Sequence, residues 1–132
     1  MVGLSELMTS DVIVFTPDQP IEEAIRTLID NHISGAPVVD KSNKILGVVS
    51  EADLLKVFWE TRARLIGDIM THSPRSFHVN TPVADVVDCL MSNTFRRVLI
   101  HDSSGQLVGL VSRADLMPSI LDALLKRINT RS

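Results

Sequence analysis

Several classes of protein depend on residues that this sequence lacks or nearly lacks. It holds a single cysteine, Cys89, which excludes a disulfide scaffold within one chain and makes a cytoplasmic protein the simplest expectation. It has no tyrosine and only 4% aromatic residues, and it shows no basic and aromatic stripe of the kind that binds nucleic acid. Since 13 Lys and Arg stand against 16 Asp and Glu, no overall basic field attracts nucleic acid or an acidic membrane surface.

Long apolar runs and catalytic or metal-binding motifs are missing as well. No run approaches the roughly 18 to 20 apolar residues that a membrane-spanning helix needs, so we expect no membrane partner. Residues 1–10 lack the basic start and apolar core of a secretory signal. No Gly-x-Ser-x-Gly elbow occurs, and we expect no enzymatic activity. We also expect no metal, because none of the histidines has ligand spacing to another or to Cys89: they are His32, His72, His78 and His101.

What the sequence does contain is an internal repeat with an offset of 62 residues. The run GVVSEAD at residues 47–53 returns as GLVSRAD at residues 109–115, and the two halves align without a gap. Such a repeat indicates two copies of one structural unit. Further identities in this register pair Met8-Thr9 with Met70-Thr71, Phe15 with Phe77, Pro20 with Pro82, Leu28 with Leu90, and Asp40 with Asp102.

Each copy predicts the same order of elements. A proline suited to a first helical position, acidic residues after it and apolar residues at helical spacing predict a helix from residue 20 and again from residue 82. Two β-branched runs around a tight turn predict a pair of strands, and a second helix is expected after Ser50 and after Ser112. The expected strands are residues 12–15, 36–39 and 45–49, and then 75–79, 98–101 and 107–111.

The predicted fold class is therefore α/β (α+β), with two β-α-β-β-α repeats. About 50 residues make a poor independent domain, so we expect the repeats to pack through their sheets about a pseudo-two-fold axis. The first repeat, with the N-terminal segment and linker, is assigned residues 1–66, and the second, with the C-terminal helix, residues 67–132. The apolar stripe of the last helix is core or dimer interface, and we favour an interface.

The repeated Ser-x-x-Asp pattern at residues 50–53 and 112–115 has two interpretations. In the first, each serine caps a helix and each aspartate completes a capping box, which contributes roughly 1 kcal/mol per cap. In the second, the free N–H groups of the helix start bind a phosphate and the serine hydroxyl donates to it. The aspartate would then accept hydrogen bonds from two vicinal hydroxyls, as ribose offers. The spacing alone leaves both interpretations open.

The whole pattern resembles a tandem pair of cystathionine β-synthase (CBS) motifs. The residues that carry the resemblance are the repeat, the Met-Thr openings, SGAPVVD at residues 34–40 and the two glycine-apolar-apolar-Ser-x-x-Asp runs. The resemblance implies two clefts per pair, often used for AMP, ADP, ATP or S-adenosylmethionine. It also implies a regulatory role, no cofactor beyond such a ligand, and a homodimer built as a flat disc.

Carried over residue by residue, the resemblance implies that Asp53 and Asp115 bind ribose and that Ser50 and Ser112 take the phosphate-side positions. It implies that adenine packs in each cleft against a wall of early strand residues. That wall is formed in the first cleft by Ile13, Val14, Ala36 and Pro37, and in the second cleft by Ser76, Phe77 and Val98.

The two clefts differ in charge beside the serine. Glu51 stands in the first copy where Arg113 stands in the second, and Arg97 lies nearby in the second copy's sequence. We therefore predict that the second cleft prefers phosphorylated ligands. In its adenine wall, Leu99 replaces the proline found at residue 37.

We interpret the chain as a regulatory module. It is expected to bind an adenosine-containing ligand in clefts between the repeats, to form a homodimer, and to signal to a regulated partner protein. The alternative is a structural dimerisation or interaction module without a nucleotide ligand, in which both Ser-x-x-Asp runs are only helix caps.

Overall fold

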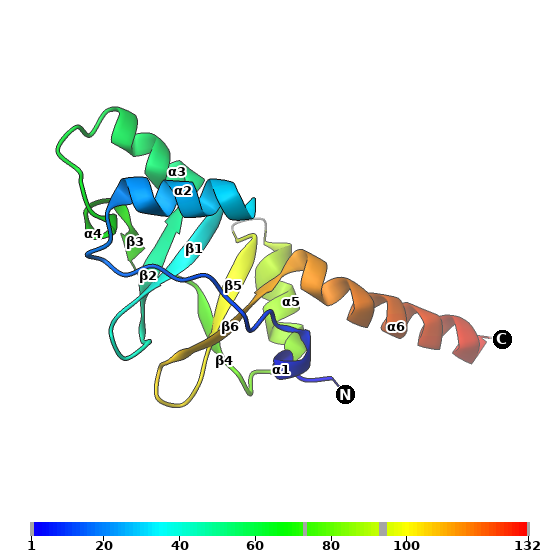
Figure 1. Ribbon diagram of the computed structural model, residues 1–132. Coiled ribbons are helices and arrows are strands. Elements are labelled where there is room, and N and C mark those ends of the chain that lie inside the picture. The colour runs from blue at the N-terminus through cyan, green and yellow to red at the C-terminus, as the bar shows by residue number, and fades with distance from the viewer. Residues whose placement is uncertain (1, 73, 93–94, 132) are drawn as a thin grey trace. The chain divides into compact units, whose positions relative to one another are not determined.

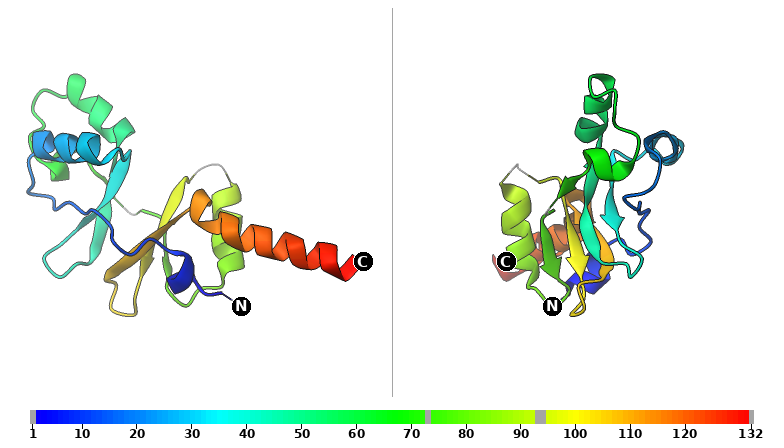
Figure 2. Two further views of the ribbon diagram at one scale, coloured as in Figure 1. Left: turned by 45° about the vertical axis from the view of Figure 1, so that its right-hand side comes forward. Right: turned by 90° about the vertical axis from the view of Figure 1, so that its left-hand side faces the viewer.

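The computed structural model describes residues 2–72, 74–92 and 95–131, and divides the chain into two compact units (Figure 1). What we call the first unit comprises Val12–Pro74 and His101–Leu107. The second unit comprises Met1–Asp11, Arg75–Ile100 and Val108–Ser132. Helices accompany two small three-stranded sheets, as Figure 2 shows, which confirms the predicted mixed α and β fold class. The packing of the two sheets about a pseudo-two-fold axis stays a prediction.

The sheet of the first unit is antiparallel, in the order β1-β2-β3. Its strands are β1 (Gly35–Val39), β2 (Ile45–Ser50) and the short β3 (Thr71–His72). Its helices are α2 (Ile21–Asn31), α3 (Glu51–Leu55), the 3₁₀ turn η1 (Lys56–Phe58) and α4 (Ile66–Ile69). The helix predicted from residue 20 is thus α2, which has Glu22 and Glu23 in its first turn and ends at His32 in the left-handed conformation.

The second copy contributes a sheet in the order β4-β5-β6. Its strands are β4 (Ser76–His78), β5 (Arg97–His101) and β6 (Leu107–Ser112), and the helices of the second unit are α1 (Leu4–Leu7), α5 (Val83–Met91) and α6 (Arg113–Arg131). The helix predicted from residue 82 is α5. The helix predicted after Ser112 is α6, which tolerates Pro118 near its start.

One expected strand is not formed. Residues 12–15 make a single bridge, in which the Phe15 N–H donates to the Pro37 carbonyl and the Val39 N–H donates to the Phe15 carbonyl, both at 2.9 Å. The buried Phe15 side chain anchors this extended segment. Pro17 and Pro20 follow at once, and because proline has no N–H the pairing cannot continue.

The two hairpin turns repeat one hydrogen-bond pattern. An Asp40 carboxylate oxygen accepts from the N–H groups of Ser42 and Lys44, at 2.8 and 3.0 Å. In the second copy the Asp102 carboxylate accepts from Ser104 and Gln106 at 2.9 and 3.0 Å. These aspartates therefore fix the tight turns that the sequence predicts.

The two hydrophobic cores are built from corresponding positions. Leu28, Val38 and Val49 of the first unit have Leu90, Ile100 and Val111 as their counterparts 62 residues later. All six are buried. The repeat therefore determines which side chains leave water in each unit, and hydrophobic burial is the main term that holds each sheet to its helices.

The opening segment of each repeat packs with the strands of the other repeat. Leu4 of α1 lies in the core of the second unit, and its counterpart Ile66 of α4 lies in the core of the first. Thr9 bridges to Leu110 of β6, while Thr71 pairs with Val48 of β2. The compact units therefore cross the boundary between residues 66 and 67 that the sequence assigns to the repeats.

This exchange explains the repeated glycines of the two Ser-x-x-Asp runs. A Cβ atom at Gly47 would clash with the Thr71 carbonyl oxygen, and one at Gly109 would lie 2.9 Å from the Thr9 carbonyl oxygen. A methyl group at either position would push the crossing Met-Thr segment off the strand. Glycine is required here for close backbone approach.

Candidate functional site

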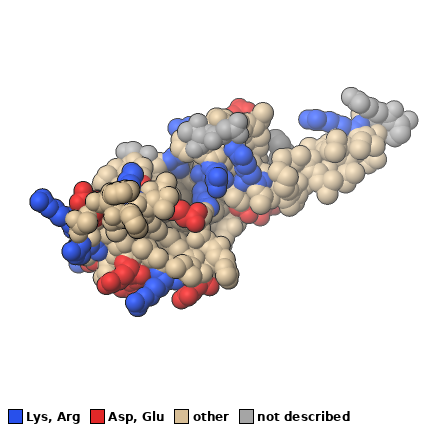
Figure 3. Space-filling model, turned by 90° about the horizontal axis from the view of Figure 1, so that it is seen from above, with Lys and Arg blue, Asp and Glu red and all other residues tan. Residues whose placement is uncertain are grey.

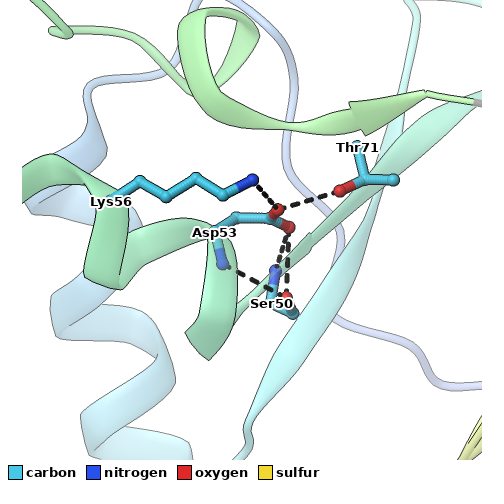
Figure 4. Close-up of polar contacts among 4 residues, drawn as sticks. All are labelled: Ser50, Asp53, Lys56 and Thr71. Atoms are coloured by element: carbon cyan, nitrogen blue, oxygen red, sulfur yellow. Dashed lines mark hydrogen bonds and ion pairs between the residues drawn. The ribbon is translucent and has the colours of Figure 1, made fainter. Parts of the chain in front are cut away.

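The first Ser-Asp site, Ser50 and Asp53, lies where β2 passes into α3 (Figure 4). Oγ of Ser50 accepts from the Asp53 N–H at 3.4 Å. Oδ2 of Asp53 accepts in return from the Ser50 N–H at 2.9 Å and from the Ser50 hydroxyl at 3.1 Å. This is the capping box that the sequence allows as one of two interpretations.

The second carboxylate oxygen of Asp53 is also held by the chain. Oδ1 accepts from the Thr71 hydroxyl at 2.8 Å and lies 3.7 Å from Nζ of Lys56. Asp53 is only 4% exposed, whereas the Lys56 side chain is largely in solvent. Figure 4 shows Thr71 and Lys56 approaching the same carboxylate oxygen from opposite sides. Both oxygens of this aspartate therefore have partners within the first unit.

The second Ser-Asp site, Ser112 and Asp115, repeats the cap where β6 passes into α6. The Ser112 N–H and hydroxyl donate to Oδ2 of Asp115 at 2.8 and 3.1 Å, and the Asp115 N–H donates to the Ser112 hydroxyl at 3.3 Å. Among the residues that the structure describes, Oδ1 of Asp115 accepts no hydrogen bond. Asp115 is half-buried, whereas Asp53 is buried.

One substitution between the repeats, at the position of Lys56, contributes to this difference, whereas the threonine of the Met-Thr pair is the same in both. Pro118 occupies the position of Lys56 and brings no cation to Asp115. Thr9, the counterpart of Thr71, is held to Leu110 through its main chain. The sequence analysis missed Thr71 and Lys56 as partners of Asp53, although the repeated Met-Thr pair was a signal for the threonine.

The charged residues beside the serines take different positions. Nε of Arg113 donates to the Leu90 carbonyl at 3.0 Å, at the C-terminal end of α5, where a cation is favoured by the helix dipole. Glu51 lines a groove between α2 and α3 of the first unit. Arg97, on β5, is half-buried. The two repeats therefore differ in charge beside the serine, as the sequence indicates. The Arg113 side chain, however, is held by a hydrogen bond to the end of α5.

The residues assigned to the adenine walls are of two kinds. Ala36, Pro37 and Val98 are buried in their sheets. The other four assigned residues are accessible: Ile13, Val14, Ser76 and Phe77. The Arg75 guanidinium lies 4.7 Å from the centre of the Phe77 ring, a cation–π contact that the sequence analysis did not anticipate.

The family is identified by a match of both repeats. The CBS domain model matches residues 4–60 and again residues 66–122. The chain belongs to the CBS domain family. The tandem pair inferred from the repeated motifs is thereby confirmed.

Relatives of this CBS pair cover nearly the whole chain. The chloroplastic CBS domain-containing protein CBSX1 of Arabidopsis thaliana is 29% identical over 98% of this chain and 67% of its own length. The crystal structure of CBSX2 in complex with AMP has a TM-score of 0.83 at 28% identity, covering 93% of this chain and 98% of that one. The inosine-5'-monophosphate dehydrogenase of Methanocaldococcus jannaschii is 27% identical over 85% of this chain but only 22% of the enzyme.

A further solved CBS pair shares the fold. The CBS domain pair of protein MJ0100, in complex with 5-methylthioadenosine and S-adenosyl-L-methionine, has a TM-score of 0.78 at 23% identity. In this chain, no described helix has both the length and the hydropathy to cross a membrane. Nor do the described residues form a group of three or more metal-ligating side chains.

Proposed function

We propose that this CBS pair is a regulatory module that binds an adenosine-containing ligand, with Asp115 of the second Ser-Asp site as the ribose ligand. The observation that carries the proposal is that Oδ1 of Asp115 accepts no hydrogen bond from the described residues, since a ribose hydroxyl can then donate to it without displacing any of them. The AMP complex of CBSX2, which is similar over most of both chains, supports the ligand class.

The first Ser-Asp site is the weaker one in this proposal. A ribose hydroxyl that approaches Asp53 must displace the Thr71 hydroxyl from Oδ1, so part of the binding energy is spent on breaking a hydrogen bond to a charged acceptor. Glu51 also places a negative charge next to this site, whereas Arg113 places a positive charge next to the second Ser-Asp site. The interaction of one such exposed charge with a ligand phosphate is about 1 kcal/mol at 4 Å in water.

Ser112 and the start of α6 supply the phosphate side of the proposed site. The helix has 19 residues, and its first N–H groups and positive dipole end favour an anion. We assign the adenine wall to Ser76, Phe77 and Val98, with Arg97 as a further cation. Phe77 is partly buried against the core of the second unit and offers the exposed part of its ring for stacking, and the buried Val98 supports this wall.

The chain is further proposed to act without catalysis, as a homodimer that passes its ligand state to a regulated protein. Ligand binding shifts such a module only by the difference in affinity between its states. The rival function is a structural interaction module, which the two capping boxes favour because they give both aspartates a role without any ligand.

Calorimetry with AMP, ATP and S-adenosylmethionine tests the proposal. We expect binding by the wild-type chain and a loss of at least about tenfold in affinity for Asp115→Asn, whose amide oxygen still accepts from the Ser112 N–H and preserves the cap. Asp53→Asn is the matched control and is expected to bind as the wild type does. Absence of heat with all three ligands at about millimolar concentration would favour the interaction module, and a larger loss for Asp53→Asn would refute the choice of site.

A further inference from the structure

The guanidinium of Arg75 lies over the Phe77 ring in the second unit, 4.7 Å from the ring centre. Arg75 is exposed, and it forms no ion pair among the residues that the structure describes. A guanidinium stays charged throughout the pH range of folded proteins, and its fork of N–H groups matches a carboxylate or a phosphate. The ring that we assign to the adenine wall therefore carries a cation whose charge has no anionic partner in the described chain.

The first repeat has neither feature at the corresponding positions. Ile13, the counterpart of Arg75, packs against the core of the first unit, and Phe15, the counterpart of Phe77, is only 1% exposed. Phe77 packs on its own core but keeps part of its ring accessible. Of the two copies, the second is thus the one that offers an aromatic ring to a ligand, and this ring has a cation on it.

A substitution in the neighbouring strand fixes the main chain of Arg75. The Leu99 N–H donates to the Arg75 carbonyl at 3.0 Å, whereas Pro37, at this position of the first repeat, has no N–H to donate. Arg75 is thereby held beside β5, near the start of that strand at Arg97. A tight turn joins β5 to β6, which ends at Ser112, so the start of β5 and the end of β6 lie at one end of the sheet. Arg75 therefore stands at the sheet end that carries the second Ser-Asp site.

The charge at this end of the sheet changes in one direction between the repeats. Three positions that are neutral or acidic in the first copy hold arginine in the second: Ile13 and Arg75, Gly35 and Arg97, and Glu51 and Arg113. In Figure 3, Lys and Arg side chains gather beside the base of α6, the helix that extends to the right. Arg113 is already bound to the Leu90 carbonyl, whereas moving Arg75 breaks a cation–π contact at an exposed site, which is weak. Of Arg75 and Arg113, Arg75 is therefore the one that turns toward a ligand at the lower cost.

We propose that Arg75 is a specificity-determining residue, which makes the second Ser-Asp site select an adenosine that carries a phosphate. This inference deepens the proposed function and rests on it. Adenine that stacks on the accessible part of Phe77 takes the place of the guanidinium on the ring. The phosphate of AMP then accepts hydrogen bonds from the displaced guanidinium, whereas adenosine leaves it without a partner. The ligand therefore gains affinity through its phosphate in exchange for the contact that its base breaks.

Calorimetry with AMP and adenosine tests the inference, because the two ligands differ only in the phosphate. The wild-type chain is expected to bind AMP more tightly than adenosine. Arg75→Ile, which installs the residue of the first repeat, is expected to weaken AMP binding at least about fivefold, the effect of one charge at about 4 Å in water. The same variant should bind adenosine as tightly as the wild type or more tightly, because the ring is uncovered.

Two further variants separate charge from shape. Arg26→Ile makes the same change at an exposed position of α2 in the first unit, and is expected to leave both affinities unchanged. Arg75→Lys keeps the positive charge without the planar fork, and is expected to bind AMP with an affinity between those of the wild type and Arg75→Ile. AMP binding by the wild type should also fall more steeply with added salt than AMP binding by Arg75→Ile, since salt screens an exposed charge. A purely structural role of Arg75 predicts neither this salt dependence nor the unequal response of the two ligands.

The outcomes separate this inference from the proposed function. A wild-type chain that binds none of the adenosine ligands overturns both, and one that binds S-adenosylmethionine but not AMP keeps the proposed function and overturns the selection by Arg75. AMP binding that is lost in Asp115→Asn but unchanged in Arg75→Ile overturns only the role of Arg75. Equal weakening of AMP and adenosine in Arg75→Ile means that the residue supports the wall structurally, and this result also overturns the inference.

Discussion

Replacing each repeated aspartate with alanine should separate a structural carboxylate from one that is kept for a ligand. Asp53→Ala removes a capping box, which contributes about 1 kcal/mol. It also removes the acceptor of the Thr71 hydroxyl at 2.8 Å, and a hydrogen bond to a charged group contributes about 1.5–3 kcal/mol. The exposed Lys56 adds little, since such ion pairs are worth about 0–1 kcal/mol. We expect Asp53→Ala to lower the free energy of unfolding by about 2–4 kcal/mol.

Asp115→Ala should cost only the cap, about 1 kcal/mol, because Oδ1 of Asp115 has no partner among the described residues. Urea denaturation followed by circular dichroism measures both variants, with the midpoint compared at equal slope. Equal losses for the two variants would refute the assignment of Asp53 as the structural member of the pair.

A second pair of variants isolates the hydroxyl that makes the difference. Thr71→Val keeps the shape of the side chain and removes its donor, and should destabilise the chain by about 1–2 kcal/mol, since Thr71 is partly in solvent. Thr9→Val is its counterpart in the repeat and should change stability by less than about 0.5 kcal/mol. In a double-mutant cycle, Thr71→Val should cost much less when Asp53 is already alanine. A cycle without such coupling would show that the Thr71 hydroxyl does not stabilise the carboxylate.

Two further predictions concern the backbone of the first unit. Gly47→Ala should destabilise the chain by about 2 kcal/mol or more in thermal unfolding, because its methyl group meets the Thr71 carbonyl. Gly3→Ala has open space and changes only the N-cap of α1, so it should cost less than about 1 kcal/mol. A tolerated Gly47→Ala would mean that β3 does not lie on β2. The N–H groups of Arg64 and Leu65 donate to Asp68 and lower the pKa of its carboxyl group below the ordinary value of 3.8. The Asp68 carboxylate therefore contributes to the free energy of unfolding above about pH 4, and this contribution is lost as the pH falls through the lowered pKa. The difference in stability between wild type and Asp68→Ala, measured by urea titration, should shrink in acid. A difference that persists unchanged at about pH 2 would contradict this.

The sequence by itself determined the duplicated architecture, because its evidence is local. Proline before an acidic first turn fixes the start of α2 and α5, and β-branched runs around Asp40 and Asp102 fix the hairpins. The Ser-x-x-Asp spacing sets both caps, since a capping box involves residues only three apart. The strand expected at residues 12–15 is not formed, because prolines end the pairing just where apolar residues favour a strand.

Only the tertiary structure decided which aspartate has a carboxylate oxygen without a partner among the described residues. The opening segment crosses a strand in both repeats, but only the Thr71 hydroxyl, 18 residues from Asp53 in the chain, donates to the aspartate among the described residues. No periodicity within a repeat encodes such a crossing. The same holds for the glycines at positions 47 and 109, whose lack of a side chain makes sense only once the crossing backbone is in place. Local hydrogen bonds follow from sequence spacing, whereas contacts between distant segments follow from how the chain folds back on itself.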